Sequence, residues 1–299
     1  MINNETVLTE YSKISSIRAV SRKLGISRTA IRRSLVGSNI HIMDSRSAQL
    51  SIGYITEKNK FVLSSREKAY LYGLVMGDLT PVRKSNYTLK LITHSTHRTF
   101  MELLCKTFEK YGQSNYRETK SKTMFRFQSH IDLESFSFLL DSKNEIIPNW
   151  IHSDNFFDFL AGFIDSDGSV ILRKSGKYFQ FVIRFFGQNL NLLIEVKTRL
   201  EVLGYDVSIH KGHSKGDLSY HKCIKFEYNK DYFTLETYKK SQTIDLLNRI
   251  SIRHPEKIAK REMIFNINNR NVIYWKDVET EVKELKSKIK QTVLSKTSL

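Results

Sequence analysis

Two short apolar segments of this chain place small residues four positions apart and end on an aspartate. The first copy reads LYGLVMGD over residues 71–78, and the second reads LAGFIDSD over residues 160–167. Residues four apart lie on the same face of a helix, so the small residues of each copy would stack there. Two helices with such a face can cross with their backbones close together. The pattern therefore predicts a tight helix pair that brings Asp78 and Asp167 side by side.

The residues after each aspartate repeat one order of expected elements. Each half is expected to continue with a strand pair, a helix, a second strand pair and more helix. The expected strands are 79–83 with 87–94, 116–120 with 124–129, 169–173 with 178–188, and 206–211 with 221–228. The expected helices between the pairs are 97–111 and 190–203, and both run into a glycine. The sequence thus predicts an α+β fold of two pseudo-symmetric αββαββα repeats.

The N-terminal region has the pattern of a helix-turn-helix. Apolar residues give one helical face over 17–24 and another over 26–35, and Gly25 between them can take the left-handed conformation of a sharp turn. The second helix would present four side chains to base edges and phosphates, namely Arg28, Thr29, Arg32 and Arg33. A small helical hairpin with a solvated basic face is the alternative interpretation.

The expected domain boundaries follow from these patterns. They are a helix-turn-helix domain over 1–45, a linker over 46–64, a first repeat over 65–150, a second repeat over 151–275 and a basic amphipathic helix over 276–299. Pro148 marks the seam between the repeats, because proline ends the element before it.

The charge balance limits the kinds of partner. The 299 residues include 48 Lys and Arg against 31 Asp and Glu, a formal net charge of +17, which favours a polyanion because contacts to phosphate release counterions. No apolar run has the length of a signal peptide core or a membrane span. Its two cysteines lack metal-binding spacing, so we expect free thiols. We therefore expect a soluble, cytoplasmic or organellar protein of a reducing compartment, neither secreted nor membrane-bound.

The second copy resembles a known signature. Over residues 160–168 it departs from the nine letters LAGLIDADG only at Phe163 and Ser166. The chain is similar, over about residues 66–265, to the LAGLIDADG homing endonucleases of the single-chain, two-repeat kind. This resemblance implies a monomeric, sequence-specific double-strand DNA endonuclease with a long asymmetric target, which cuts across the minor groove and leaves short 3′ overhangs.

The same resemblance implies a metal centre. Two carboxylates that meet raise each other's pKa unless a cation neutralises them, and Mg²⁺ prefers carboxylate, carbonyl and water oxygens. The resemblance assigns the metal to Asp78 and Asp167, with backbone oxygens of Gly77 and Ser166 contributing, and Mn²⁺ is expected to substitute. In the first copy Leu79 stands in place of the signature's last glycine, where its bulk could crowd Asp78.

Basic and amide side chains at alternate strand positions predict a DNA-binding saddle. A sheet laid in the major groove turns every second side chain toward the bases. The strand residues expected to contact DNA are Lys90, His94, Arg126, Arg173, Arg184 and Gln188. Lys90 and Arg184 are expected at corresponding places, since each precedes His94 or Gln188 by four residues.

A basic segment near the C-terminus adds a third candidate for catalysis. Residues 253–261 resemble the segment that reaches the active centre of the family from behind, which implies that Lys257 orders water or stabilises charge. The first half lacks an equally clear counterpart, and Lys143 is the nearest candidate. This asymmetry predicts that the two DNA strands are cut at different rates.

Two other functions stay open on the same fold. One is a non-catalytic transcription regulator that binds DNA through the helix-turn-helix. The other is a maturase that binds intron RNA and assists its folding.

Overall fold

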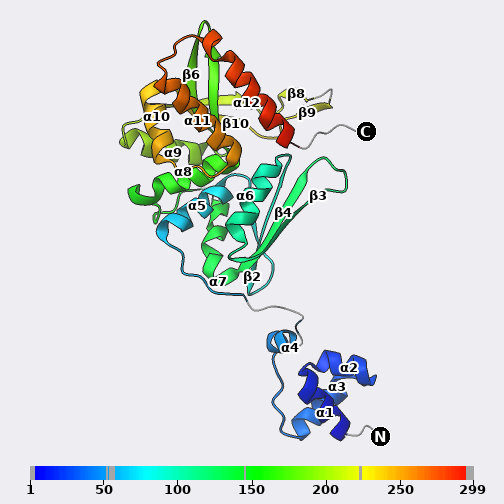
Figure 1. Ribbon diagram of the computed structural model, residues 1–299. Coiled ribbons are helices and arrows are strands. Elements are labelled where there is room, and N and C mark those ends of the chain that lie inside the picture. The colour runs from blue at the N-terminus through cyan, green and yellow to red at the C-terminus, as the bar shows by residue number, and fades with distance from the viewer. Residues whose placement is uncertain (1–3, 52, 54–57, 145, 222–223, 294–299) are drawn as a thin grey trace. The chain divides into compact units, whose positions relative to one another are not determined.

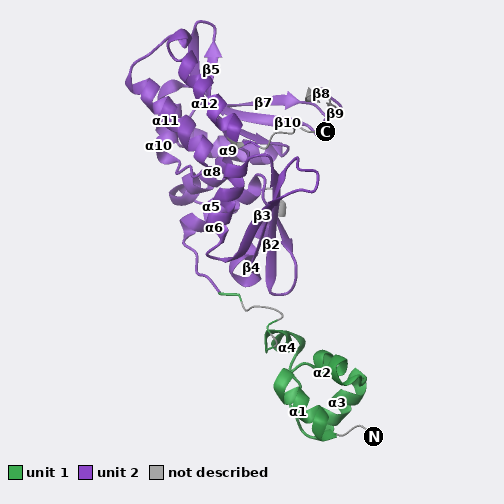
Figure 2. Ribbon diagram, turned by 45° about the vertical axis from the view of Figure 1, so that its right-hand side comes forward, with its two compact units in different colours: residues 1–59 green, residues 60–299 purple. Residues whose placement is uncertain are grey.

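The computed structural model describes residues 4–51, 53, 58–144, 146–221 and 224–293. Its contacts divide the chain into two compact units, Met1–Asn59 and Lys60–Leu299, which are coloured separately in Figure 2.

The N-terminal unit is a small helical domain. Its helices are α1 (Asn4–Ile14), α2 (Ile17–Leu24), α3 (Arg28–Gly37) and α4 (Ser45–Ser51). Gly25 joins α2 to α3 with φ 66°, and the Ser27 side chain caps α3 by accepting a hydrogen bond from the backbone N–H of Ala30. The two helices expected from the sequence and the turn between them are therefore present.

Two helices of this unit were not expected. Helix α1 contributes the fully buried Val7 and the nearly buried Tyr11 to a core with Val20 and two apolar residues of α3. Helix α4 occupies residues that the sequence pattern assigned almost entirely to the linker over 46–64. Asp44 explains the start of α4, because its carboxylate accepts backbone N–H groups of the first turn.

The larger unit contains two successive repeats of the same elements (Figure 1). The first repeat consists of α5 (Ser65–Met76), β1 (Thr80–Arg83), β2 (Thr88–Ser95), α6 (Arg98–Phe108), β3 (Gly112–Glu118), β4 (Phe125–Asp132), α7 (Leu133–Phe136) and the 3-10 helix η1 (Ser137–Asn144). The second consists of α8 (Ser153–Asp167), β5 (Ser169–Ser175), β6 (Tyr178–Gly187), α9 (Leu190–Val202), β7 (Val207–His213), β8 (Leu218–His221), β9 (Ile224–Glu227), β10 (Tyr232–Thr237), α10 (Lys240–Arg249) and α11 (Pro255–Asn269).

The two main sheets have the same topology. Their strand orders are β1-β2-β4-β3 and β5-β6-β10-β7, with every neighbouring pair antiparallel. The prediction of an α+β fold built from two pseudo-symmetric αββαββα repeats is therefore confirmed.

One strand of the second repeat was predicted wrongly. We expected residues 221–228 to complete the second strand pair, but β8 and β9 form a separate two-stranded sheet and β10 fills that place. Strand β10 pairs with both β6 and β7, and it buries Leu235, Glu236 and Thr237 at 7% exposure or less. The apolar side chain of Leu235 explains why β10 suits an internal position, because an internal strand needs side chains that can be covered on its core face.

The two signature helices cross at their small residues. A Cβ atom on Gly73 would lie 2.1 Å from the backbone oxygen of Phe159, and one on Gly162 would lie 2.0 Å from that of Tyr70. No side chain fits at such distances, so α5 and α8 approach each other through bare backbone. Around this crossing a single apolar core runs through both repeats, and large aromatic residues such as Phe163 are completely or nearly completely buried in it.

The chain continues past α11 into a short 3-10 helix, η2 (Trp275–Asp277), and then α12 (Glu279–Thr292). Val278 and Val282 are buried against the body, as expected of an amphipathic C-terminal helix. Among the described residues, no helix has the length and apolar character needed to cross a membrane. Cys105 is a partly exposed free thiol, and Cys223 lies outside the described residues.

Candidate active site between the two repeats

The structure places Asp78 and Asp167 next to each other, close enough that each carboxyl group acts on the pKa of the other. Asp167 is the last residue of α8, and Asp78 follows the end of α5 by two residues. The close approach depends on Gly77, where a Cβ atom would lie 2.0 Å from the Ser166 hydroxyl oxygen and 3.2 Å from the backbone nitrogen of Asp167. The absence of a side chain at this position is what allows the two aspartates to meet.

Both carboxyl groups are reachable by solvent and are electrostatically strained. Asp78 is exposed and Asp167 is partly exposed, so an ion or a phosphate can approach them. The neighbouring protein atoms remove part of the water around both carboxyl groups and so raise the pKa of both, and the negative charge of Asp78 adds to the effect at Asp167, whose pKa rises to about 7. The two groups titrate as a pair, and a cation bound between them would remove their repulsion.

Leu79 does not crowd the pair. It is buried in the apolar core, and its backbone N–H donates to the oxygen of Leu74 at 3.2 Å. Its counterpart Gly168 has no such room, because a Cβ atom there would lie 2.5 Å from Cα of Ile164. The first copy therefore tolerates a side chain at a place where the second does not.

Lys257 lies directly beside the aspartate pair at the end of α8. Its ammonium group donates to the backbone oxygen of Asp165 at 2.9 Å and to that of Ser166 at 3.1 Å, and also to that of Ile164. Burial lowers the pKa of Lys257 to about 8, against the opposing attraction of three nearby aspartates. Lys257 thus satisfies the free carbonyl groups of a helix C-terminus and places a positive charge next to Asp167.

Asp165 anchors the segment that carries Lys257. This carboxylate is completely buried and accepts the backbone N–H groups of Arg253 at 2.9 Å and His254 at 3.0 Å, together with the Tyr70 hydroxyl at 2.9 Å. The first copy has Met76 at the equivalent position and cannot form this anchor. The side chain of Lys143 lies outside the described residues.

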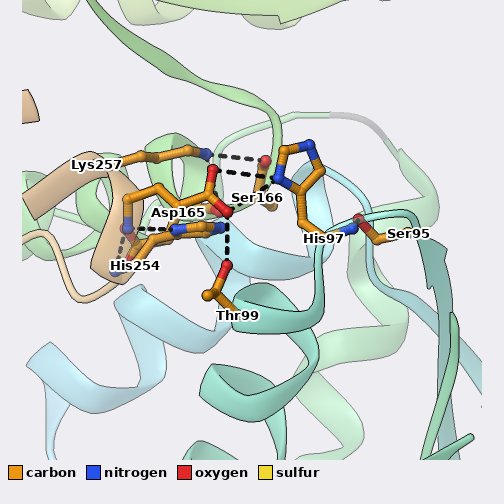
Figure 3. A network of polar contacts seen from close by, with 8 residues as sticks. Ser95, His97, Thr99, Asp165, Ser166, His254 and Lys257 are labelled. Atoms are coloured by element: carbon orange, nitrogen blue, oxygen red, sulfur yellow. Dashed lines mark hydrogen bonds and ion pairs between the residues drawn. The ribbon is translucent and has the colours of Figure 1, made fainter. Parts of the chain in front are cut away.

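Further polar contacts join the two repeats in the same network as Lys257 and Asp165 (Figure 3). The Glu256 carboxylate lies 3.0 Å from Nδ1 of His97 and accepts the Thr99 hydroxyl at 2.7 Å. His254 caps α11 by accepting the backbone N–H of Glu256 at 3.2 Å, and its ring stacks on Phe100. Burial lowers the pKa of His254, so this imidazole is neutral.

These groups surround one cavity of about 330 Å³. Its walls include Asp78, His97, Ser166, Lys257 and Lys260. The cavity therefore combines a carboxylate, backbone oxygens and cations, which is the mixture that a metal-bound phosphate requires.

The donor set fits a hard divalent cation. Two adjacent carboxyl groups, one with a pKa of about 7, would be relieved by such an ion, and carboxylate oxygens are ligands that hard cations prefer. The Ser166 backbone oxygen already accepts from Lys257, and Gly77 lies at the end of α5, directly before Asp78. Asp78, Asp167 and the Gly77 oxygen are therefore the best candidates for ligands.

The outer face of the first sheet carries the expected residues. Lys90 and His94 lie on the same face of β2, and Arg126 of β4 stands directly opposite His94. The Nε atom of Arg126 is buried and has no hydrogen-bond partner in the described part of the chain. Each of these side chains remains a candidate for contact with DNA.

The outer face of the second sheet holds its arginines differently. Arg173 and Arg184 are both tied to Glu236, and Gln188 donates to the hydroxyl group of Tyr232. The register also corrects the expected equivalence of Lys90 and Arg184. Thr80 pairs with Ile92 as Ser169 pairs with Arg184, so Arg184 corresponds to Ile92.

In the N-terminal unit, the four predicted contact residues of α3 are all exposed: Arg28, Thr29, Arg32 and Arg33. Three of them line a hollow of about 680 Å³ together with Arg18 and Arg22 of α2 and residues of α4. A concave surface with this many arginines suits an anionic partner.

Sequence reasoning missed the supporting residues of the site. Asp165 was visible as part of the signature, but its role depends on contact with residues 253–254, far away in the chain. His97 and Glu256 interact although they belong to different repeats, so no local pattern could show their contact. For the cap of α11 the sequence gives one weak sign, which is that Glu256 follows His254 by two residues at the start of a helix. Contacts between distant segments leave no periodic signal.

Comparison with known proteins places this geometry in context. Residues 156–253 match the family model described as a LAGLIDADG-like domain. The uncharacterized protein MJ0398 of Methanocaldococcus jannaschii is 24% identical over 260 residues, which cover 84% of this chain and 87% of that protein. The uncharacterized protein MJ0314 of the same organism is 25% identical over 197 residues, with 60% and 69% covered.

Solved structures with a similar arrangement include two homing endonucleases. I-DmoI in complex with DNA and Mn has a TM-score of 0.39 at 19% identity, covering 64% of this chain and 98% of that chain. I-SmaMI bound to an uncleaved DNA target in the presence of calcium ions has a TM-score of 0.43 at 11% identity, covering 76% and 98%. At these scores neither neighbour adds evidence beyond the family match.

Proposed function

We propose that this chain, which carries a LAGLIDADG-like domain over residues 156–253, is a DNA endonuclease. Its catalytic centre, formed by Asp78 and Asp167, would hydrolyse the phosphodiester bonds of DNA. The observation that carries the proposal is the close approach of these two carboxyl groups, one from each repeat, in a chain of net charge +17. Carboxylates that repel each other at the end of a helix crossing destabilise a protein unless a ligand uses them.

A divalent cation, Mg²⁺ or Mn²⁺, held by Asp78 and Asp167 would supply activation of water and stabilisation of the leaving oxygen. Lys257 is the third catalytic candidate, because its buried ammonium group lies next to Ser166 and would stabilise negative charge on the phosphate. Its hydrogen bonds to three carbonyl groups hold it at that place.

Substrate binding is assigned to the two sheets and the N-terminal unit. The outer sheet faces would enter the major groove, with six candidate residues: Lys90, His94, Arg126, Arg173, Arg184 and Gln188. Helix α3 would contact DNA through Arg28, Thr29, Arg32 and Arg33 as a recognition helix. Because the two repeats differ at equivalent positions, the target of this monomer is long and asymmetric.

The proposal can be tested without knowledge of the target. A randomised duplex library is first selected for binding in EDTA, and the enriched duplexes are then incubated with Mg²⁺ or Mn²⁺. We expect metal-dependent cleavage at one site, lost in Asp78→Asn and in Asp167→Asn while binding is retained. Selected duplexes that stay intact with either metal would overturn the endonuclease proposal.

The second candidate is a non-catalytic DNA-binding regulator. The exposed arginines of α3 favour it, because they could bind duplex without any contribution from the aspartates. Enrichment of a duplex without cleavage is the result that supports this function. Preferential binding of a folded intron RNA in competition with the duplex would instead indicate a maturase.

A further inference from the structure

The second sheet has a carboxylate at the centre of its basic outer face. Glu236 lies on the internal strand β10, opposite Arg184 of β6 and Ser208 of β7, and it is only 7% exposed. An acid at this place is unexpected in a surface that is proposed to bind a polyanion, since it repels phosphate. The contacts of Glu236 with neighbouring side chains explain its presence there.

Glu236 binds two arginines at once. Its Oε1 accepts from Nε of Arg184, and its Oε2 lies 3.4 Å from Nη1 of Arg173. Arg173 is held further by Gln180, whose side-chain oxygen accepts from Nη2 at 3.0 Å. A buried carboxylate shared in this way fixes guanidinium groups that would otherwise sample many rotamers.

The contact leaves the outer edge of Arg184 available. Glu236 engages Nε, and the described residues provide no partner for the two Nη groups. The Arg184 side chain is 26% exposed, so these donors can be reached from outside. Two parallel donors of one arginine match the O6 and N7 acceptors of guanine in the major groove.

The first repeat lacks this device. Ile92 occupies the place equivalent to Arg184, and Gln128 stands opposite it where Glu236 stands opposite Arg184. An apolar side chain favours the methyl group of thymine and offers no donor for guanine. The two halves of a bound site would therefore be read by different chemistry at corresponding positions.

We propose that Glu236 is a positioning residue for specificity, which holds Arg184 in the orientation that reads a guanine in the half-site bound by the second repeat. This inference rests on the proposed function in so far as that function includes sequence-specific binding to duplex DNA. It does not depend on the metal or on cleavage.

The test is a binding selection from a randomised duplex library in EDTA, run with the wild-type protein, Glu236→Gln, Arg184→Ala and the double variant. Wild type should enrich a guanine at one position, and Arg184→Ala should lose that preference alone. Glu236→Gln should reduce the discrimination at the same position by about tenfold. The double variant should discriminate no worse than Arg184→Ala, because Glu236 acts through that arginine.

Salt dependence provides a second measurement, which reports whether the arginines become available to phosphates. Freed from Glu236, the arginines can contact phosphates, so affinity for a scrambled duplex should rise and the slope of log K against log salt should steepen by about one. Glu102→Gln is the matched control, because Glu102 also accepts from an arginine Nε, that of Arg98 at 2.9 Å, but lies on α6. This control should leave base preference unchanged.

The outcomes separate the inference from the proposed function. If wild type enriches no sequence, specific DNA binding itself fails. If wild type enriches a site and a folded Glu236→Gln selects it with the same discrimination and salt slope, the role of Glu236 is overturned. If Glu236→Gln does not fold, as judged by circular dichroism, Glu236→Asp replaces it, since the shorter side chain keeps the charge but withdraws it from Arg184. Unchanged guanine preference in a folded Glu236→Asp would likewise overturn the role.

Discussion

The ammonium group of Lys257 donates a hydrogen bond to the backbone oxygen of Ser166 at 3.1 Å, immediately before the catalytic candidate Asp167. This contact ties a lysine from near the end of the chain to the terminus of the signature helix. It gives Lys257 two roles that can be separated by experiment, capping of α8 and stabilisation of charge at the cavity.

Lys257→Met should reduce both stability and cleavage. Loss of the donor leaves carbonyl groups at the end of α8 without their partner, and loss of the charge should lower the cleavage rate by roughly 10²-fold or more. Lys260→Met is the control, because Lys260 lines the same cavity, whereas the carbonyl groups at the end of α8 accept from Lys257. Cleavage by wild type should also decline above about pH 8, where Lys257 loses its proton. A flat rate from pH 7 to 10 would exclude a charged role.

Asp167→Asn should stabilise the metal-free protein at alkaline pH. The pKa of Asp167 is about 7 in the folded protein, against an ordinary value of 3.8. Between pH 3.8 and pH 7 the folded state therefore binds a proton at Asp167 that the unfolded state has lost. The free energy of unfolding of the wild type consequently falls as the pH rises through that range. The melting temperature of the variant in EDTA should exceed that of wild type by a few degrees at pH 8, and the gap should close toward pH 4. The exposed Asp277→Asn serves as control; an equal gap at both pH values would contradict the linkage.

Gly162→Ala should destabilise the larger unit strongly. The new Cβ atom would lie 2.0 Å from the Tyr70 backbone oxygen and would force α5 and α8 apart, at a cost of about 3 kcal/mol or more. Gly212→Ala is the matched control on β7, where the nearest atom would lie 3.6 Å away. Urea denaturation of both variants measures the difference. Equal midpoints would show that the helices do not require bare backbone at their crossing.

Arg28→Ala combined with Arg32→Ala should weaken DNA binding without slowing cleavage of bound DNA. Each lost phosphate contact reduces the salt slope by about one, so the pair should reduce it by about two. Lys13→Ala, which removes a charge from α1, should have a smaller effect. Salt titrations of binding by fluorescence anisotropy give the slopes. Unchanged slopes and affinity would remove the recognition-helix assignment of α3.

Much of the fold follows from local pattern. The glycine spacing before Asp78 and Asp167 required a close helix crossing, and the repeated order of apolar periods required two similar sheets. The replacement of residues 221–228 by β10 could not be foreseen, because both segments have strand-like composition and local pattern does not decide which of them pairs with β6 and β7.

The supporting part of the site is a matter of tertiary structure. Glu236 and Arg184 are far apart in the chain. Their hydrogen bond forms because β10 pairs with β6 in the folded sheet. In the same way, Asp165 became an anchor only when residues 253–254 came to lie against it. Such pairings depend on which segments are buried together, and sequence proximity does not encode that choice.

The sequence alone determined that two glycine-bearing helices would end on aspartates within a strongly basic protein, because helical periodicity and charge are local properties of the chain. Tertiary structure decided that Lys257 lies beside one aspartate and that a carboxylate restrains the arginines of one sheet. The physical reason is that these contacts form between side chains brought together by a shared core, and their geometry arises only when that core is packed.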